Sequence, residues 1–172
     1  MALTRSIEKL VPSNDGYVCE LDGGQSVSAR AVVLATGVDW RRLQAKGEDR
    51  LLEHGVFYGA ARHEAANLVG KKVFIVGGGN SAGQAAMYLS SYAAQVTMLV
   101  RGDGQYLIDQ IESKSNITVV PHAQVVSVEG ENYLEQIEVG VNAPIEMEDI
   151  RCYEADALFK FRVADNPLRT RQ

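Results

Sequence analysis

The strongest constraint on the fold is an apolar segment that runs directly into three consecutive glycines. Residues 71–76 read KKVFIV, and the glycines occupy positions 77–79. Beyond them, apolar residues at 82, 86, 89 and 93 recur at helical spacing, which predicts a helix over residues 81–93. A second apolar run follows at residues 96–100. A strand, a tight turn, a helix and a second strand in this order predict a βαβ unit with parallel strands.

The loop between the first strand and the helix has the spacing G-x-G-x-x-A. Its first glycine permits a sharp turn out of the strand, its second lets a pyrophosphate approach the backbone, and its alanine lets the helix pack closely on the sheet. N–H groups at the start of the helix, together with the helix dipole, attract phosphates. The alternative is a tight turn without a ligand. The order of strand, loop, helix and strand favours a dinucleotide site, formed by Gly77, Gly78, Gly79, Asn80, Ser81 and Ala82.

Arg101, at the end of the second predicted strand, indicates which dinucleotide binds. NAD sites usually place an Asp or Glu there to bind the ribose 2′-hydroxyl, whereas a cation suits the 2′-phosphate of NADP. Asp103 lies two residues further on and favours NAD. The alternative for Arg101 is a surface cation without a ligand. We predict NADPH as the coenzyme.

The rest of the chain predicts the α/β class, as a Rossmann-like NAD(P)-binding domain with a central parallel sheet and a β-meander. The short first segment reads as the tail of another domain. Further strands are predicted at residues 6–11, 17–21, 31–35, 117–120 and 155–163, helices at 61–68 and 106–114, and the meander at 124–141. The run at 31–35 is typical of a strand buried on both faces. The predicted boundaries are 1–37 for the incomplete first domain, 38–54 for a connector, 55–163 for the nucleotide-binding domain and 164–172 for a tail.

Composition argues against several classes of function. The formal net charge of -5 disfavours a nucleic-acid surface, and no apolar run approaches the roughly 20 residues that a membrane helix needs. The first residues form no apolar signal-peptide core, so we expect a cytoplasmic location. The two cysteines lie far apart without a CxxC pair, and the histidines at 54, 63 and 122 have no metal-ligand spacing. We expect no metal, and no residue qualifies as a catalytic acid, base or nucleophile.

The chain resembles thioredoxin-reductase-like, FAD/NAD(P)-dependent pyridine nucleotide-disulfide oxidoreductases in two runs, VFIVGGGNSAGQAAMYLS and VTMLVRGDG. The preceding RAVVLATGVDWRRL resembles the strand by which such proteins leave their FAD domain. The resemblance implies that NADPH passes hydride to FAD, which then reduces a disulfide or another acceptor. It also implies that the glycine loop holds the NADPH pyrophosphate, that Arg101 holds the 2′-phosphate, and that Thr36 and Gly37 lie near the flavin in a complete protein.

Three departures from this family pattern bear on the activity. In the stretch GVFYGAARHE, Gly59 and Arg62 stand where the redox-active cysteines are expected, so dithiol chemistry through this motif is excluded. The FAD-binding glycine motif and the later Gly-Asp segment are missing, so we expect this chain alone to bind FAD poorly and to be inactive. Gly102 replaces a second arginine next to Arg101, and the stretch FKFRV places two cations where the family has an apolar strand.

We interpret the chain as the NADPH-binding fragment of a flavoprotein oxidoreductase. One alternative is a flavoprotein of the ferredoxin–NADP reductase type, which also lacks CxxC, and another is a regulatory module that senses nucleotide without catalysis. The expected cofactors are NADPH and, in the full-length parent, FAD. The expected partners are the missing FAD domain and a redox protein or small-molecule electron acceptor, with a homodimer as a further option, and neither nucleic acid nor membrane.

Overall fold

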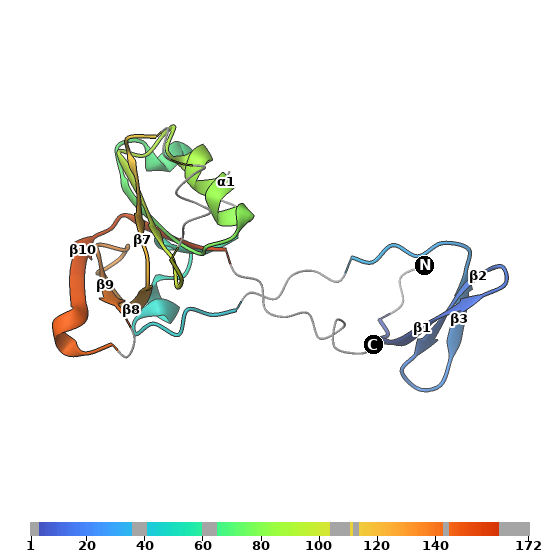
Figure 1. Ribbon diagram of the computed structural model, residues 1–172. Helices are drawn as coiled ribbons and strands as arrows, with labels where there is room; N and C mark the ends of the chain where they lie inside the picture. The colour runs from blue at the N-terminus through green and yellow to red at the C-terminus, as the bar shows by residue number, and fades with distance from the viewer. Residues whose placement is uncertain are drawn as a thin grey trace. The chain divides into compact units, whose positions relative to one another are not determined.

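The structure is a computed structural model, and it describes residues 4–35, 41–59, 65–103, 111, 114–142 and 145–161. The chain divides into two compact units, Met1–Gly37 and Val38–Gln172 (Figure 1). Among the described residues, no helix is long and apolar enough to cross a membrane. The second unit contains the glycine loop, so it positions the candidate site.

The first unit is a three-stranded antiparallel sheet in the order β1-β2-β3. A turn at Asn14 and Asp15 joins the first two strands. The next residue, Gly16, has φ 142°, and a Cβ on it would lie 2.3 Å from the carbonyl oxygen of Ala29, so only glycine fits. The sequence does not predict the third strand, because SVSA has little apolar alternation. The strands are β1 (Ile7–Ser13), β2 (Gly16–Leu21) and β3 (Ser26–Ala29).

The prediction of a buried strand at residues 31–35 is wrong. These residues form no strand, and Val33 and Leu34 are 90% and 71% exposed. A strand that is buried on both faces needs neighbouring strands and a covering layer on each side. Within the described part of the first unit, no strand pairs with this run. The apolar pattern therefore indicates a need for burial that the first unit by itself does not meet.

Five parallel strands form the main sheet of the second unit, in the order β4-β11-β5-β6-β7. The predicted parallel pairing of β5, β6 and β7 is confirmed. β11 comes last in the chain but lies between β4 and β5, so the chain order reverses beside β5. Because all five strands run the same way, their carboxyl ends share one edge of the sheet. The strands are β4 (Val56–Tyr58), β5 (Lys72–Val76), β6 (Gln95–Leu99), β7 (Ile117–Val120) and β11 (Ala157–Lys160).

Alternate side chains of the main sheet face two different cores. In β5, Val73 and Ile75 pack with α1 (Asn80–Leu89) on one face, and Phe74 packs on the other face against a three-stranded antiparallel sheet (Figure 1). This burial on both faces explains the nearly continuous apolar runs of the parallel strands. The antiparallel sheet, in the order β10-β9-β8, contains the predicted meander and one strand more. Its strands are β8 (Ala123–Glu129), β9 (Gln136–Val141) and β10 (Ile150–Glu154).

The segment 38–54, which is predicted as a connector, contributes to the second core where it is described. Leu43, Ala45 and Leu51 are buried in the same cluster as Phe74. Leu51 is the last residue of the short 3-10 helix η1 (Glu48–Leu51). Charges and glycine dominate this segment, so its few apolar positions show no period, and only the packing identifies them as core.

The predicted helices agree with the structure only in part. α1 ends at Leu89, before residue 93, and the Asn116 side chain donates hydrogen bonds to the carbonyl oxygens of Ser90 (2.9 Å) and Ala93 (3.2 Å) just beyond this end. Of the predicted helix 61–68, the described part is the 3-10 helix η2 (Ala65–Leu68). The predicted helix 106–114 lies almost entirely outside the described residues. A third 3-10 helix, η3 (Met147–Asp149), precedes β10.

Candidate nucleotide-binding site

Gly77 and Gly78 connect β5 to α1 where the fold leaves no room for a side chain. Gly77 has φ 152°, and a Cβ on it would lie 3.1 Å from the Cβ of Ala82. Its N–H donates to the carbonyl oxygen of Leu99 at 3.1 Å, which ties the loop to the end of β6. A Cβ on Gly78 would lie 2.4 Å from Cγ1 of Val100. The buried Ala82 packs in the α1 core, so the fold alone explains these three small residues.

Gly79 differs, because the fold gives no reason for a glycine there. Its backbone is extended (φ −101°, ψ 175°), which any residue adopts, and a Cβ on it would meet no atom within 4 Å. Gly79 is the N-cap of α1, whose first turn has no acidic residue and receives no side-chain cap from the described residues. Gly78, Gly79, Asn80 and Ser81 are all exposed. The start of α1 therefore presents backbone N–H groups and the positive end of the helix dipole to solvent.

Arg101 follows β6, at the edge of the sheet that also carries the glycine loop. Its side chain is exposed. The preceding residue, Val100, is fixed on both sides, since its N–H donates to Val120 at 3.0 Å and its carbonyl oxygen accepts from Ala123 at 2.9 Å. The end of β6 is thus held beside the end of β7. This strand end, next to the glycine loop, is where an arginine accommodates a 2′-phosphate in Rossmann folds.

The acidic residue near Arg101 has a partner. Oδ1 of Asp103 lies 2.9 Å from Nε2 of His122, which follows β7 at the same edge of the sheet. The sequence pattern does not mark His122 as a site residue, because the spacing of the histidines tests only for a metal site. The signal in the sequence that could have identified His122 is its position. His122 follows β7, which runs parallel to β6, and Arg101 follows β6.

Several predicted positions lie elsewhere. Thr36, Gly37 and Arg62 are outside the described residues. Gly59, at the first cysteine position of the family pattern, follows β4 with φ 87°, and its N–H donates to the carbonyl oxygen of Lys160 at 3.1 Å. Lys160, the first of the two cations in the stretch FKFRV, is only 3% exposed at the end of β11.

No group of three His, Cys, Asp or Glu within the described ranges could hold a metal ion.

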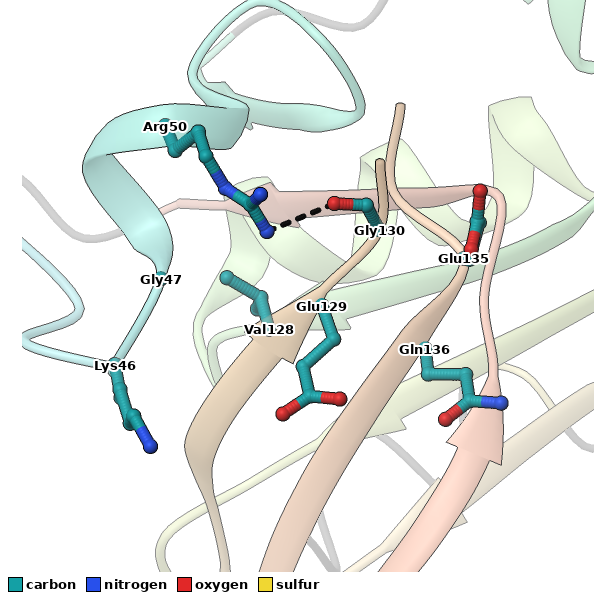
Figure 2. Close-up of a pocket in the computed structure, with 8 residues that line it drawn as sticks. All are labelled: Lys46, Gly47, Arg50, Val128, Glu129, Gly130, Glu135 and Gln136. Carbon is teal, nitrogen blue, oxygen red and sulfur yellow. Dashed lines mark hydrogen bonds between the residues drawn. The ribbon is translucent and has the colours of Figure 1, made fainter. Parts of the chain in front are cut away.

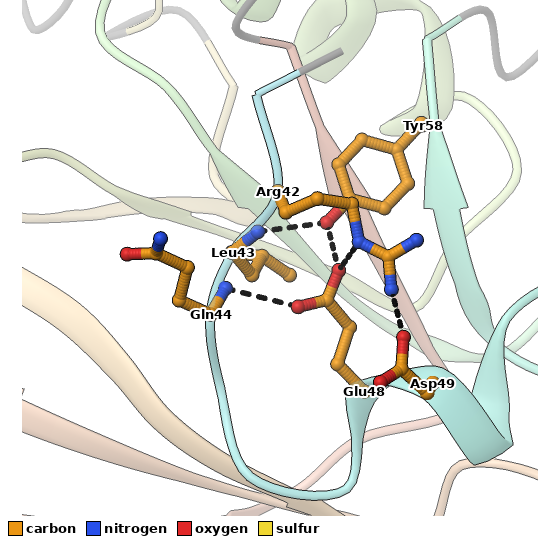
Figure 3. Close-up of polar contacts among 6 residues, drawn as sticks. All are labelled: Arg42, Leu43, Gln44, Glu48, Asp49 and Tyr58. Atoms are coloured by element: carbon orange, nitrogen blue, oxygen red, sulfur yellow. Dashed lines mark hydrogen bonds and ion pairs between the residues drawn. The ribbon is translucent and has the colours of Figure 1, made fainter.

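A polar network lies beside the end of β4 (Figure 3). The buried carboxylate of Glu48 accepts hydrogen bonds from the Tyr58 hydroxyl, from Nε of Arg42 at 2.9 Å and from the backbone N–H of Gln44 at 2.9 Å. The Tyr58 hydroxyl also accepts a bond from the N–H of Leu43 at 2.8 Å. Burial, together with the bond to Glu48, raises the pKa of Tyr58 above its ordinary value, so the phenol stays protonated. The network fastens the segment before η1 to β4.

Two hollows that described residues of the second unit line do not coincide with the glycine loop. One of about 410 Å³ lies at the β8–β9 turn beside η1 (Figure 2). It combines Lys46 and Arg50 with Glu129 and Glu135, and Arg50 donates to the carbonyl oxygen of Gly130 at 2.8 Å. This balanced charge gives no preference for an anion. The other, of about 380 Å³, is lined by residues before or at the start of β4, β5 and β11, together with Tyr133 and Leu134. Ligands of open α/β sheets bind instead at the carboxyl ends of the strands.

Comparison with known proteins identifies the family. The chain matches the pyridine nucleotide-disulphide oxidoreductase family model over residues 2–160. A component of the alkyl hydroperoxide reductase of Pseudomonas putida is 36% identical over 130 residues, which cover 72% of this chain and 25% of that protein. Thioredoxin reductase of Mycoplasma genitalium is 34% identical over 130 residues, which cover 73% of this chain and 41% of that protein. The solved structure of thioredoxin reductase from Giardia duodenalis superposes with a TM-score of 0.79 at 24% identity, and covers 92% of this chain and 52% of that one.

The chain belongs to the pyridine nucleotide-disulphide oxidoreductase family, a family of flavoprotein oxidoreductases that use FAD and NAD(P)H. Within this family it is thioredoxin-reductase-like. The predicted α/β fold class, a Rossmann-like domain with a central parallel sheet and a β-meander, is confirmed. The chain spans 25% and 41% of the length of the two curated relatives named above.

Proposed function

We propose that the second unit binds NADPH at the glycine loop and presents the nicotinamide to an FAD that another part of the full-length protein holds. The observation that carries this proposal is Gly79, a glycine with ordinary backbone angles and open space above it at the start of a helix. A ligand that approaches the backbone closely explains such a residue, whereas a tight turn does not. Family membership supplies the class of the ligand.

The described residues fit a bound dinucleotide. The exposed N–H groups of Asn80 and Ser81 would hold the pyrophosphate, and the exposed Arg101 would hold the 2′-phosphate. Thr36 and Gly37 are proposed to lie near the flavin, by the family pattern alone. NADPH supplies a hydride and FAD accepts it, so the chain itself needs no catalytic acid or base. Its residues bind the coenzyme and orient it.

The electron acceptor is proposed to be something other than a dithiol within this motif. Gly59 and Arg62 replace the expected cysteines, so electrons would leave the flavin for a redox protein or a small molecule. This observation also favours the second candidate, a flavoprotein of the ferredoxin–NADP reductase type. Stopped-flow spectroscopy of the full-length protein distinguishes the two candidate functions. Transfer to a one-electron acceptor passes through a flavin semiquinone, whereas transfer to a two-electron acceptor does not.

Arg101→Ala should weaken NADPH binding by about 1–3 kcal/mol, the value of a hydrogen bond to a charged group. The affinity for NADH should change little, because NADH has no 2′-phosphate. Isothermal calorimetry with both coenzymes measures the two effects. The assignment of Arg101 would be contradicted by equal losses of affinity for NADPH and NADH. It would also be contradicted if the unsubstituted 172-residue chain bound NADH more tightly than NADPH.

Gly102→Arg provides a gain-of-affinity counterpart to this variant. A Cβ on Gly102 would meet no atom within 4 Å, so a side chain can begin there without a clash. It restores the second cation of the family pattern, and NADPH binding should tighten by about 1 kcal/mol while NADH binding stays the same. If Gly102→Arg increases the affinity for neither coenzyme, the end of β6 does not face the 2′-phosphate.

The 172-residue chain should show only background turnover when it is supplied with NADPH, FAD and a disulfide dye. The reason is that it lacks both the FAD-binding glycine motif and the CxxC pair. Absorbance of the dye measures the rate. Turnover that survives Cys19→Ser and Cys152→Ser would mean that the chain binds FAD productively. Turnover that is lost with those changes would assign a redox role to the two free cysteines.

A further inference from the structure

Asp103, which lies two residues after Arg101, is an acidic residue at the same edge of the sheet as the glycine loop. A carboxylate near the end of β6 is the acceptor that NAD sites use for the ribose 2′-hydroxyl, and its charge repels a 2′-phosphate. In the structure, Oδ1 of Asp103 already lies 2.9 Å from Nε2 of His122. An imidazole that carries a proton on Nε2 donates to a carboxylate whether the ring is neutral or charged.

The backbone of His122 is held on both sides. Its N–H donates to the carbonyl oxygen of Gly102 at 3.4 Å, and its own carbonyl oxygen accepts from Asn142 at 2.8 Å. Its φ of 52° lies in the left-handed region, which residues other than glycine adopt rarely and which gathers at functional sites. These contacts place the imidazole beside Asp103, on the loop that carries Arg101.

We propose that His122 selects NADPH over NADH by acting through Asp103. By donating to Oδ1 of Asp103, His122 competes with the 2′-hydroxyl of NADH for one oxygen of the carboxylate. The hydrogen bond that His122 donates also offsets part of the negative charge that would repel the 2′-phosphate. His122 is thus a positioning residue that does not itself touch the coenzyme. The inference rests on the proposed NADPH site.

The test measures the dissociation constants of NADPH and NADH with the 172-residue chain by calorimetry. The quantity of interest is the selectivity ratio, Kd for NADH divided by Kd for NADPH. His122→Ala should lower the ratio about two- to fivefold, because the Asp103 and His122 side chains are 84% and 48% exposed and an exposed charged pair contributes at most about 1 kcal/mol. His122→Asn should keep most of the ratio, because asparagine tolerates left-handed backbone and retains an N–H donor. His54→Ala is the matched control, since His54 is an exposed imidazole that precedes β4 at the opposite edge of the sheet.

Asp103→Asn shows whether His122 acts through the carboxylate. This single variant should not lower the selectivity ratio, and in its background His122→Ala should change the ratio by less than about twofold, as expected for a coupled pair. An equal loss of selectivity with and without Asp103 would mean that His122 contacts the phosphate directly, and it would overturn the proposal. So would an unchanged ratio in a folded His122→Ala chain that still binds both coenzymes. If the unsubstituted 172-residue chain binds neither coenzyme, the proposed function is overturned as well.

Discussion

Gly79→Val should lower the affinity for NADPH at least tenfold, about 1.4 kcal/mol, and should leave the fold intact. Residue 79 has extended backbone angles and open space for a Cβ, so a branched side chain is tolerated but occupies the path of the pyrophosphate. The stability cost should stay below about 1 kcal/mol, the difference between glycine and a poor residue at a helix N-cap. Melting temperatures with and without millimolar NADPH measure both effects, because a ligand that binds only the folded state raises the melting temperature.

Gly78→Val is the matched control and should show the opposite ranking. A Cβ at position 78 would come within 2.4 Å of the buried Val100 side chain, so we expect a stability loss of about 1–3 kcal/mol from overpacking. If the three glycines only formed a tight turn, Gly79→Val would destabilise the chain as Gly78→Val does, and NADPH would protect neither variant. If millimolar NADPH does not raise the melting temperature of the unsubstituted 172-residue chain, the dinucleotide proposal is wrong.

Glu48→Ala should destabilise the second unit by about 2–4 kcal/mol. Glu48 is 4% exposed, and its carboxylate accepts hydrogen bonds from Arg42, from Tyr58 and from the backbone of Gln44. Its removal leaves the Tyr58 hydroxyl and the Gln44 N–H without their acceptor, and it frees the segment before η1 from the end of β4. Chemical denaturation followed by circular dichroism measures the loss.

Asp49→Ala is the control for this network. Asp49 also pairs with Arg42, but its side chain is 92% exposed, so its loss should cost less than about 0.5 kcal/mol. Tyr58→Phe, which removes only the hydroxyl, should fall between the two variants. If Glu48→Ala and Asp49→Ala cost the same, burial does not strengthen the network and the segment before η1 is held by its apolar residues alone.

The parts of the fold that the sequence predicts are those whose signals lie close together in the chain. The βαβ unit is one continuous stretch from Lys72 to Leu99, and its two strands and the start of its helix have local causes, either apolar β-branched runs or glycines. β11 is predicted as a strand, but its place between β4 and β5 is not, because strand order depends on contacts between distant segments. At residues 31–35 the sequence predicts a buried strand that the structure does not contain. The apolar pattern implies neighbouring strands, but the pattern itself does not provide them.

The sequence by itself determined that this chain carries a strand, a glycine turn and a helix start arranged to receive an anion, because those features follow from residues adjacent in the chain. Only the tertiary structure decided which glycines serve the fold and which is open to a ligand, because that depends on Val100 and Ala82 lying against Gly78 and Gly77. The pairing of Asp103 with His122 is likewise tertiary. Their distance depends on two parallel strands ending side by side, and no local spacing encodes that alignment.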